Sequence, residues 1–479
     1  MTPAQHFIGG RFVAPVTGST VPMIDPSDGA PFAAIARGSA ADIDAAVTAA
    51  TTASAGAWGR MSPADKGRAL MRIAQTIGTH AEELALVEAR DCGKPLKQAR
   101  ADALACARYF EFYAGAPDKF HGETIPYTPG FTVLTWREPH GVTGHIVPWN
   151  YPLQIFGRTV AAALAAGNAC VVKPAEDACL SLLRLAQLAQ ECGLPDGTLN
   201  IVTGLGGEAG AALAAHPGVM HVSFTGSPAT GATVAKACAE RHCPVTLELG
   251  GKGPQIVFAD ADVDAALPVL VNAIVQNAGQ TCSAGSRVLV EKSLYASLLD
   301  KLGARFASLQ AGPALADLDC GPLIRASQRD RVRGFLESAR RDRIDIVAQG
   351  RLADDAPSNG FYVPPTLLRD VPREHRLACE EVFGPVLAAM SFNDEEDAVR
   401  MANGTDFGLV AGVWTRDGAR QLRMARAVRA GQVFINNYGA GGGVELPFGG
   451  TRHSGHGREK GFEALYGFTA LKTVVLKHD

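Results

Sequence analysis

The chain has 479 residues, with 45 Lys and Arg against 48 Asp and Glu, which gives a formal net charge of −3. The two signs are mixed along the whole chain, which excludes a dedicated binder of nucleic acid or of anionic membranes. This length predicts two or three domains, and 47% hydrophobic residues with 53 Gly and 28 Pro are typical of a loop-rich α/β protein.

The first residues, MTPAQHFIGGRFV, lack a basic segment followed by an apolar one, and no stretch approaches about 18 uninterrupted apolar residues. We therefore expect a cytoplasmic protein without a membrane partner. Ten cysteines without a CxxC pair predict neither a disulfide framework nor a zinc site. His453 and His456 form an HxxH pattern, but no third ligand is near, so no metal is expected.

The first predicted elements are helices. Residues 41–57, 62–91 and 94–116 are rich in alanine and carry apolar side chains at helical spacing. Ser62 and Pro63 are a typical N-cap and first helical residue. We expect three helices here.

From residue 142 short strands alternate with helices, which predicts a parallel, doubly wound sheet that binds ligands at the carboxyl ends of its strands. A second alternating set follows, so we expect two Rossmann-like α/β domains. The first set has predicted strands at 142–147, 169–173, 198–202, 219–224 and 244–249, and helices near 153–166, 178–192, 207–215 and 228–240. The second has strands near 254–258, 286–291, 386–392, 409–414 and 431–435, and helices near 261–278, 292–310, 325–340 and 416–428.

Three turns after predicted strands could bind a dinucleotide. Residues 204–209 fit GxGxxA, but no Asp or Glu occurs at 211–239, where a ribose-binding acid is expected. The FTGS turn at 224–227 could receive a pyrophosphate on its backbone N–H groups. Lys173 and Glu176 could hold ribose hydroxyls, and the carboxylate would repel a 2′-phosphate, which favours NAD over NADP. Each glycine cluster alone is equally consistent with a tight turn, and Lys173 with Glu176 alone would more often be a surface ion pair.

Three polar segments beside predicted strands carry groups that could react. Cys282 lies in the small, polar loop GQTCS, where a substrate could reach its sulfur. Glu248 ends a strand at the junction of the two α/β sets and could take a proton from water if its surroundings raise its pKa. The Asn150 amide, just after strand 142–147, could donate to a developing oxyanion. A cysteine by itself, however, is more often an inert core residue.

Over nearly its whole length the chain resembles the NAD(P)-dependent aldehyde dehydrogenase superfamily, because seven motifs occur in family order and at family-like spacing. They are PWNYP at 148–152, KPAE at 173–176, FTGS at 224–227, ELGGK at 248–252, GQTC at 279–282, EEVFGP at 380–385 and PFGG with SGxGRE at 447–459.

The resemblance implies three parts and a symmetric assembly. The parts are an NAD-binding domain at 1–116 and 140–247, a catalytic domain at 248–446, and a small β oligomerisation arm at 117–139 and 463–479. Homodimers or homotetramers are the usual assemblies of such chains.

Carried over residue by residue, the resemblance makes Cys282 the nucleophile and Glu248 the general base. Asn150, with the Cys282 backbone N–H, becomes the oxyanion hole, and Glu459 an auxiliary proton relay. Cofactor contacts are implied for Ile146, Pro148, Trp149, Lys173, Glu176, Gly206, Phe224, Gly226, Ser227, Leu249, Glu381 and Phe383.

The implied reaction oxidises an aldehyde to a carboxylic acid with NAD⁺ and water, through a cysteine thiohemiacetal and a thioester. Relatives that pass the acyl group to coenzyme A generally lack the glutamate of ELGGK. This chain has Glu248, which predicts hydrolysis. Many relatives carry Lys where this chain has Thr159, so a proton relay through that residue is lost here. Glu459 is therefore the more important candidate for a proton relay.

The substrate is less constrained. Arg158 stands where several relatives that oxidise aliphatic aldehydes have Trp, and where succinate-semialdehyde dehydrogenases use Arg to hold a carboxylate. Some aromatic-aldehyde members also have Arg there, and a second carboxylate-binding Arg is replaced by Gln276. We expect an aromatic or bulky aldehyde, with a carboxylated semialdehyde such as succinic semialdehyde as the alternative. The glycine-rich segment 437–445 should form an open tunnel rim. The tunnel itself is expected to include Tyr151, Arg158, Thr281 and Ser283.

Overall fold

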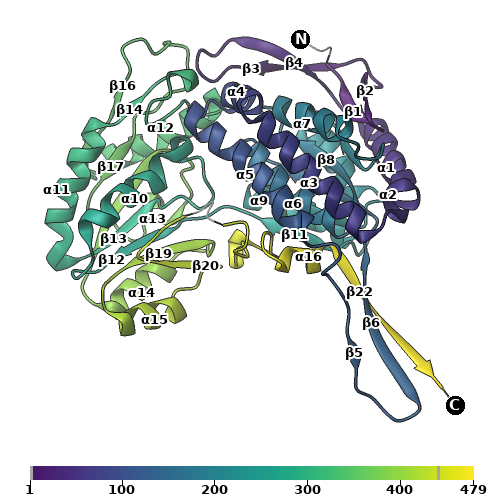
Figure 1. Cartoon of the computed structure of the whole chain (residues 1–479). Helices are drawn as coiled ribbons and strands as arrows, with labels where there is room; N and C mark the ends of the chain where they lie inside the picture. Colours follow the sequence, from purple (N-terminus) through teal and green to yellow (C-terminus); the bar gives the residue numbers. More distant parts are fainter. Residues whose placement is uncertain (1–3, 440–442, 479) are drawn as a thin grey trace.

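The structure is a computed structural model that describes residues 4–439 and 443–478. Two α/β bodies stand side by side, and a thin β arm projects from the one that contains the N-terminal helices (Figure 1). Each body has its own large hydrophobic core. The C-terminal segment returns to the first body, because Leu465 and Phe468 are buried in the first core.

The first sheet is doubly wound. Its strand order is β2-β1-β9-β8-β7-β10-β11-β21, and the five central strands are parallel. Strand order reverses between β7 and β10, and the crevice outside the carboxyl ends at such a reversal is where these sheets bind ligands. The strands are β1 (His6–Ile8), β2 (Arg11–Val13), β7 (Val142–Val147), β8 (Ala169–Pro174), β9 (Leu199–Ile201), β10 (His221–Thr225), β11 (Val245–Glu248) and β21 (Gly455–His456).

The helices of the first body follow the predictions with one correction. The predicted single helix at 62–91 is wrong, because the chain breaks at His80 into two helices. Ser62 does cap the first of them, accepting from the Asp65 N–H at 3.2 Å. The helices are α1 (Ala40–Ala55), α2 (Ala57–Arg60), α3 (Pro63–Thr79), α4 (Ala81–Cys92), α5 (Leu96–Ala114), α6 (Pro152–Ala165), α7 (Leu180–Glu191), the π-turn η1 (Gly206–Gly210), α8 (Ala211–Ala215) and α9 (Pro228–Ala239).

The second sheet has the order β15-β17-β18-β13-β12-β19-β20, and all its neighbours pair in parallel except β15 with β17. The order of its strands along the chain also reverses, at the pair β12 and β19. The predicted fold class of two doubly wound domains and a β arm is therefore confirmed. The strands are β12 (Pro254–Val257), β13 (Arg287–Glu291), β15 (Ile346–Gln349), β17 (Thr366–Leu368), β18 (Val386–Phe392), β19 (Val410–Trp414) and β20 (Gln432–Ile435).

The helices of the second body alternate with its strands. They are α10 (Val263–Val275), the 3₁₀ turn η2 (Gln276–Gly279), α11 (Lys292–Ser308), η3 (Ala314–Ala316), α12 (Ala326–Arg341), α13 (Arg376–Cys379), α14 (Glu395–Asn403), α15 (Gly418–Ala427) and η4 (Arg452–Ser454). A short helix, α16 (Glu463–Gly467), leads back to the arm.

The arm is a three-stranded antiparallel sheet in the order β22-β6-β5. It consists of β5 (Thr124–Ile125), β6 (Phe131–Pro139) and β22 (Thr469–Lys477), and its far end carries the C-terminus (Figure 1). Two small sheets complete the structure, β3 (Thr20–Ile24) with β4 (Pro31–Ala36), and β14 (Gln310–Ala311) with β16 (Arg351–Leu352). Within the described ranges, no helix is both long and apolar enough to cross a membrane.

Candidate active site

The predicted site segments meet at the reversal of the first sheet. Asn150 follows β7, and Gly226 with Ser227 follows β10, the two strands between which the order reverses. Ser227 is the N-cap of α9 and accepts from the Thr230 N–H at 3.2 Å. The Gly226 N–H donates to the Glu248 carbonyl at 3.0 Å, so this amide is already engaged. The first turn of α9 therefore lies beside the loop that follows β7.

A turn with left-handed backbone angles brings Cys282 to the end of the first sheet where its strand order reverses. The predicted helix at 261–278 is too long, because α10 ends at Val275. Asn277 and Ala278 then adopt left-handed backbone angles, with φ of 48° and 53°. Gly279 also has a positive φ of 72°, and a Cβ there would lie 2.2 Å from the Gly384 carbonyl oxygen. This turn redirects the chain, so that Cys282 faces the end of the first sheet.

The paired glycines after β11 allow two loops to touch. A Cβ on Gly251 would lie 2.1 Å from the Cys282 carbonyl oxygen, and a Cβ on Gly250 would lie 2.5 Å from a Glu381 carboxylate oxygen. The Gly251 N–H donates to that carboxylate at 2.9 Å. Any larger residue would force these loops apart.

The Asn150 amide is held in place by the cysteine loop. Its Nδ2 donates to the Gln280 carbonyl at 3.0 Å, and Asn277 Nδ2 donates to the Asn150 carbonyl at 2.8 Å. An Asn amide has two N–H donors. One of them binds the Gln280 carbonyl, and the other remains. Asn150 and Cys282 line two cavities, one on each side of them. The second N–H is therefore available to a group bound beside Cys282.

The larger cavity has a volume of about 590 Å³ and lies against α9 and α12. The edge of Trp149 meets Phe383 at its wall, with ring centroids 5.4 Å apart. Of the expected cofactor contacts, those that line it are Pro148, Trp149, Gly226, Ser227, Leu249, Glu381 and Phe383. Lining residues that were not among the expected cofactor contacts include Arg325, Gln328, Arg331 and His453.

The other expected cofactor residues lie outside this wall. Lys173 and Glu176 form an ion pair of 3.0 Å at the end of β8, the strand next to β7. Burial raises the pKa of Glu176, but Lys173 and hydrogen bonds outweigh it and hold this pKa below its usual value. Gly206 begins the π-turn η1 after β9, away from the reversal point. Ile146 and Phe224 lie within β7 and β10.

The smaller cavity has a volume of about 170 Å³ and contains all four expected tunnel residues. The Tyr151 hydroxyl and the Thr281 hydroxyl lie 2.8 Å apart in its wall. The predicted catalytic residues Asn150 and Cys282 also line it, whereas Gln98 and Asp102, four apart on one face of α5, were not predicted. The wall consists of Gln98, Ala101, Asp102, Asn150, Tyr151, Gln154, Ile155, Arg158, Gln276, Thr281, Cys282, Ser283 and Phe448. Of the expected rim, residues 440–442 lie outside the described ranges.

Glu248 and Glu459 are both 1% exposed and line neither cavity. Burial and the nearby Glu459 raise the pKa of Glu248 well above its usual value, against the effect of Arg158. Among the described residues, neither carboxylate oxygen of Glu248 has a hydrogen-bond partner. The Ser223 hydroxyl, in contrast, donates to Glu459 at 2.7 Å. Glu248 is thus a buried carboxyl without a hydrogen-bond partner among the described residues, and its raised pKa favours the protonated form.

The Cys282 thiol is also shifted toward its neutral form. Burial raises its pKa to about 11, while the Arg158 guanidinium acts in the opposite direction. Nearby Glu381 and Glu248 add to the rise. Forming a thiolate here therefore needs a proton acceptor or a compensating positive charge.

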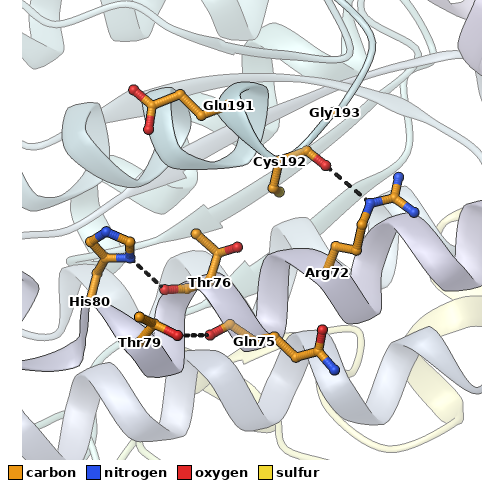
Figure 2. Close-up of a pocket in the computed structure, with 8 residues that line it drawn as sticks. All are labelled: Arg72, Gln75, Thr76, Thr79, His80, Glu191, Cys192 and Gly193. Atoms are coloured by element: carbon orange, nitrogen blue, oxygen red, sulfur yellow. Dashed lines mark hydrogen bonds between the residues drawn. The ribbon is translucent and has the colours of Figure 1, made fainter.

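A separate cavity of about 530 Å³ lies on the surface, between the ends of α3 and α7 (Figure 2). Its wall contains Arg72, which donates to the Cys192 carbonyl at 3.0 Å, and shares no residue with the cavities at Cys282. In the ranges that the structure describes, no group of three or more His, Cys, Asp and Glu side chains could hold a metal ion.

The fold and the site define a two-domain α/β oxidoreductase in which a cysteine and an amide separate a large cavity from a small one. The chain belongs to the aldehyde dehydrogenase family, whose model matches residues 12–474. It is 41% identical to the hydroxyisobutyraldehyde dehydrogenase of Mycolicibacterium austroafricanum, over 99% of this chain and 94% of that protein. It is also 41% identical to the mitochondrial benzaldehyde dehydrogenase of Antirrhinum majus, over 98% and 88%.

Solved structures agree with this assignment. A crystal structure from Burkholderia cenocepacia, provisionally described as an aldehyde dehydrogenase, is 70% identical, with a TM-score of 0.99 over 99% of this chain and 100% of that one. The NAD⁺ complex of an aldehyde dehydrogenase from Bacillus cereus is 38% identical, with a TM-score of 0.96 over 99% and 97%. This chain is therefore an enzyme that oxidises aldehydes to acids with a nicotinamide cofactor.

Proposed function

We propose that Cys282 attacks the aldehyde at the point where the two cavities meet. The observation that carries this proposal is that Cys282 and Asn150 line both cavities. The thiolate adds to the carbonyl carbon, and the oxygen becomes an alkoxide that accepts from the second Asn150 N–H and the Cys282 backbone N–H. The alkoxide then re-forms its C=O bond as a hydride leaves, which yields a thioester on Cys282.

We propose that the larger cavity holds the cofactor, and its donor groups fit one. Ser227, the N-cap of α9, lines this wall, and the N-terminal end of a helix favours an anionic pyrophosphate; Arg325 and Arg331 add positive charge in the same wall. When bound, the nicotinamide accepts the hydride that leaves the former aldehyde carbon. Glu381 and Phe383 would hold that ring, and Lys173 with Glu176 the adenosine ribose. The Glu176 carboxylate would repel a 2′-phosphate, which favours NAD over NADP.

We propose that Glu248 activates the water that hydrolyses the thioester. No hydrogen bond among the described residues restrains its carboxylate, so the side chain can rotate toward Cys282. Its raised pKa suits a group that must accept a proton from water and later release it. Glu459, buried beside it, would exchange that proton with the surroundings.

We propose an uncharged, bulky or aromatic aldehyde as the substrate. Arg158 lines the small cavity, but its guanidinium is paired with the buried Glu459 and donates to the Thr225 hydroxyl at 3.1 Å. A guanidinium neutralised in this way is a poor receptor for a second carboxylate. The benzaldehyde dehydrogenase relative supports an aromatic aldehyde. A carboxylated semialdehyde such as succinic semialdehyde remains the second candidate, because Arg158 is a cation in the tunnel wall.

We propose that residues 1–116 and 140–247 form the cofactor domain, 248–446 the catalytic domain, and 117–139 with 463–479 an arm that joins subunits. The arm exposes large apolar side chains, among them Trp136 at 49%, Leu471 at 55% and Val475 at 55%. Leu471 and Val475 share one face of this narrow sheet and Trp136 lies on the other, and exposed apolar side chains on a projecting arm favour contact with a second copy, as a dimer or tetramer.

Steady-state assays of NADH formation test these proposals. The enzyme is given benzaldehyde derivatives, short alkanals and succinic semialdehyde, each with NAD⁺ or NADP⁺ and with or without coenzyme A. We expect the highest kcat/KM for aromatic aldehydes with NAD⁺, and no requirement for coenzyme A. A strict preference for succinic semialdehyde would contradict the substrate proposal, and dependence on coenzyme A would contradict hydrolysis by Glu248.

A further inference from the structure

Two cysteines face each other at the end of α9, outside the site described above. After α9, His242 adopts a left-handed φ of 56°, and the Cys243 N–H reaches back to the Cys238 carbonyl at 2.9 Å. The His242 N–H donates to the Ala239 carbonyl at 3.1 Å. This pattern is a Schellman motif, in which the side chains at the positions of Cys238 and Cys243 are brought into contact. We call residues 238–243 the cysteine turn.

An arginine shares the binding partners of both thiols. Arg241 donates to the Ala214 carbonyl at 3.2 Å and to the Val219 carbonyl at 2.5 Å. Cys238 Sγ lies 3.9 Å from the same Ala214 oxygen, and Cys243 Sγ lies 3.5 Å from the same Val219 oxygen. The guanidinium and the two sulfurs therefore lie close together. Arg241 Nη2 is buried and, among the described residues, has no hydrogen-bond partner.

The two thiols differ in acidity and exposure. A hydrogen bond from the Cys238 thiol, together with Arg241 and against burial, lowers the pKa of Cys243. The same hydrogen bond and burial raise the pKa of Cys238. Cys243 is partly exposed, whereas Cys238 is buried. A reactive, reachable thiolate thus stands next to a protected thiol, the arrangement of a peroxide-sensitive pair.

We propose that Cys238 and Cys243 form an oxidation site at which a hydroperoxide closes an intrachain disulfide. The Cys243 thiolate attacks the peroxide, an S–O bond forms, the O–O bond breaks, and hydroxide or an alkoxide leaves and takes up a proton from water. Sulfur is oxidised by two electrons to a sulfenic acid as the peroxide is reduced. The Cys238 sulfur then attacks that sulfur, an S–S bond forms, the S–O bond breaks, and the hydroxide that leaves takes the Cys238 proton as water.

The position of the turn links it to the cofactor side of the enzyme. It joins α9, whose N-cap Ser227 lines the larger cavity, to β11, which ends at Glu248. A disulfide would fix the geometry of this connection. A thiol reductant would reverse it, because thiolate exchange opens S–S bonds.

Peptide mapping tests the proposal on the intact enzyme. The protein is treated with hydrogen peroxide, its remaining thiols are blocked with iodoacetamide, and it is digested with trypsin. Trypsin cuts after Arg241, between the two cysteines, so a disulfide would hold two peptides together until a reductant separates them. We expect this linked pair, and its loss after dithiothreitol. Recovery of both cysteines as alkylated thiols, while Cys282 is oxidised, would overturn the proposal.

Single variants distinguish the two thiols. In Cys238→Ser, we expect Cys243 to stop at the sulfenic acid, which dimedone traps. In Cys243→Ser, Cys238 should remain a free thiol, and in Arg241→Gln disulfide formation should be slower by roughly fivefold or more. Cys192→Ser is the matched control, since Cys192 is partly exposed but burial raises its pKa. Equal dimedone labelling of Cys192 and Cys243 would contradict the proposal.

Discussion

Arg158, in the wall of the substrate cavity, forms a buried ion pair with Glu459. The two side chains are 7% and 1% exposed. Arg158 also lies over the Phe448 ring at 5.0 Å, and Ser223 donates to Glu459 at 2.7 Å. Both partners influence the pKa of Glu248: Glu459 raises it and Arg158 lowers it.

Breaking this pair on one side should destabilise the enzyme. Arg158→Met leaves Glu459 buried without its countercharge, which costs about 3–5 kcal/mol. The double variant Arg158→Met with Glu459→Leu should lose less, because no charge is left uncompensated. Urea unfolding midpoints of the two single variants, the double variant and the parent give the coupling energy. Additive losses would show that the pair is not coupled.

The same variant tests the substrate. If Arg158 serves Glu459, Arg158→Met should lower kcat/KM for benzaldehyde and for succinic semialdehyde by a similar factor. A selective loss on succinic semialdehyde of about a hundredfold would instead show that Arg158 binds a carboxylate. Initial rates with both aldehydes, at saturating NAD⁺, decide between these outcomes.

Removing the proposed nucleophile should abolish turnover and keep cofactor binding. Cys282→Ala leaves the amide of Asn150 and the larger cavity in place but removes the sulfur that we propose carries the acyl group. We expect kcat to fall by roughly a thousandfold or more, with the NADH dissociation constant, measured by fluorescence titration, nearly unchanged. Cys192→Ser, on the separate surface cavity (Figure 2), is the control and should keep full activity.

Glu248→Gln should separate the two halves of the reaction. In the proposed mechanism the first half, up to the thioester, does not need Glu248, whereas hydrolysis does. Rapid mixing should therefore show a burst of about one NADH for each active site, followed by a steady rate lowered roughly a hundredfold. Loss of the burst itself would assign Glu248 to the first half.

Activity should rise with pH above neutrality. In the proposed mechanism the reactive forms are the Cys282 thiolate for attack and the Glu248 carboxylate for hydrolysis, and burial raises both pKa values, that of Cys282 to about 11. Raising the pH therefore increases the fraction of each reactive form. We expect kcat/KM, which reports the attack by Cys282, and kcat, which also reports hydrolysis, to increase from about pH 7 to about pH 10. Arg158 lowers the pKa of Cys282, so Arg158→Met should move the rise in activity to higher pH. A pH profile that reaches its plateau below neutrality would contradict the prediction.

Cofactor choice should depend on Glu176. Glu176→Gln keeps the shape of the side chain but removes the charge that would repel a 2′-phosphate, so kcat/KM for NADP⁺ should rise relative to NAD⁺ by about tenfold. Glu208→Gln, an exposed carboxylate paired with Arg37, is the matched control. An unchanged ratio in Glu176→Gln would place discrimination elsewhere.

Much of the fold could be predicted from local patterns. The predicted strands 142–147 and 386–392 coincide with β7 and β18, because short runs rich in β-branched and apolar residues, bounded by turns, are typical of buried strands. The break at His80 could not be predicted, since Ile77 and Leu84 are both buried and keep the helical spacing on either side of it. Periodicity reports which side chains are buried and is insensitive to a single non-helical residue.

The sequence offered three turns as cofactor sites, and the GxGxxA match at 204–209 was weak because no ribose-binding acid follows it. The strand order favours the turn after β10, because the reversal lies between β7 and β10 and not at β9, which precedes Gly206. Strand order results from the packing of the whole sheet. A short sequence motif does not indicate which strands will lie beside it in the folded sheet.

The sequence by itself determined the chemistry available to this enzyme: a cysteine, a carboxylate and an amide, in family order. The tertiary structure alone decided that Cys282 and Asn150 separate two cavities, and that Arg158 is committed to Glu459. These relationships join residues more than a hundred positions apart. They depend on how helices, sheets and left-handed turns pack together. Contacts between residues so far apart produce no periodic pattern in the local sequence from which they could be predicted.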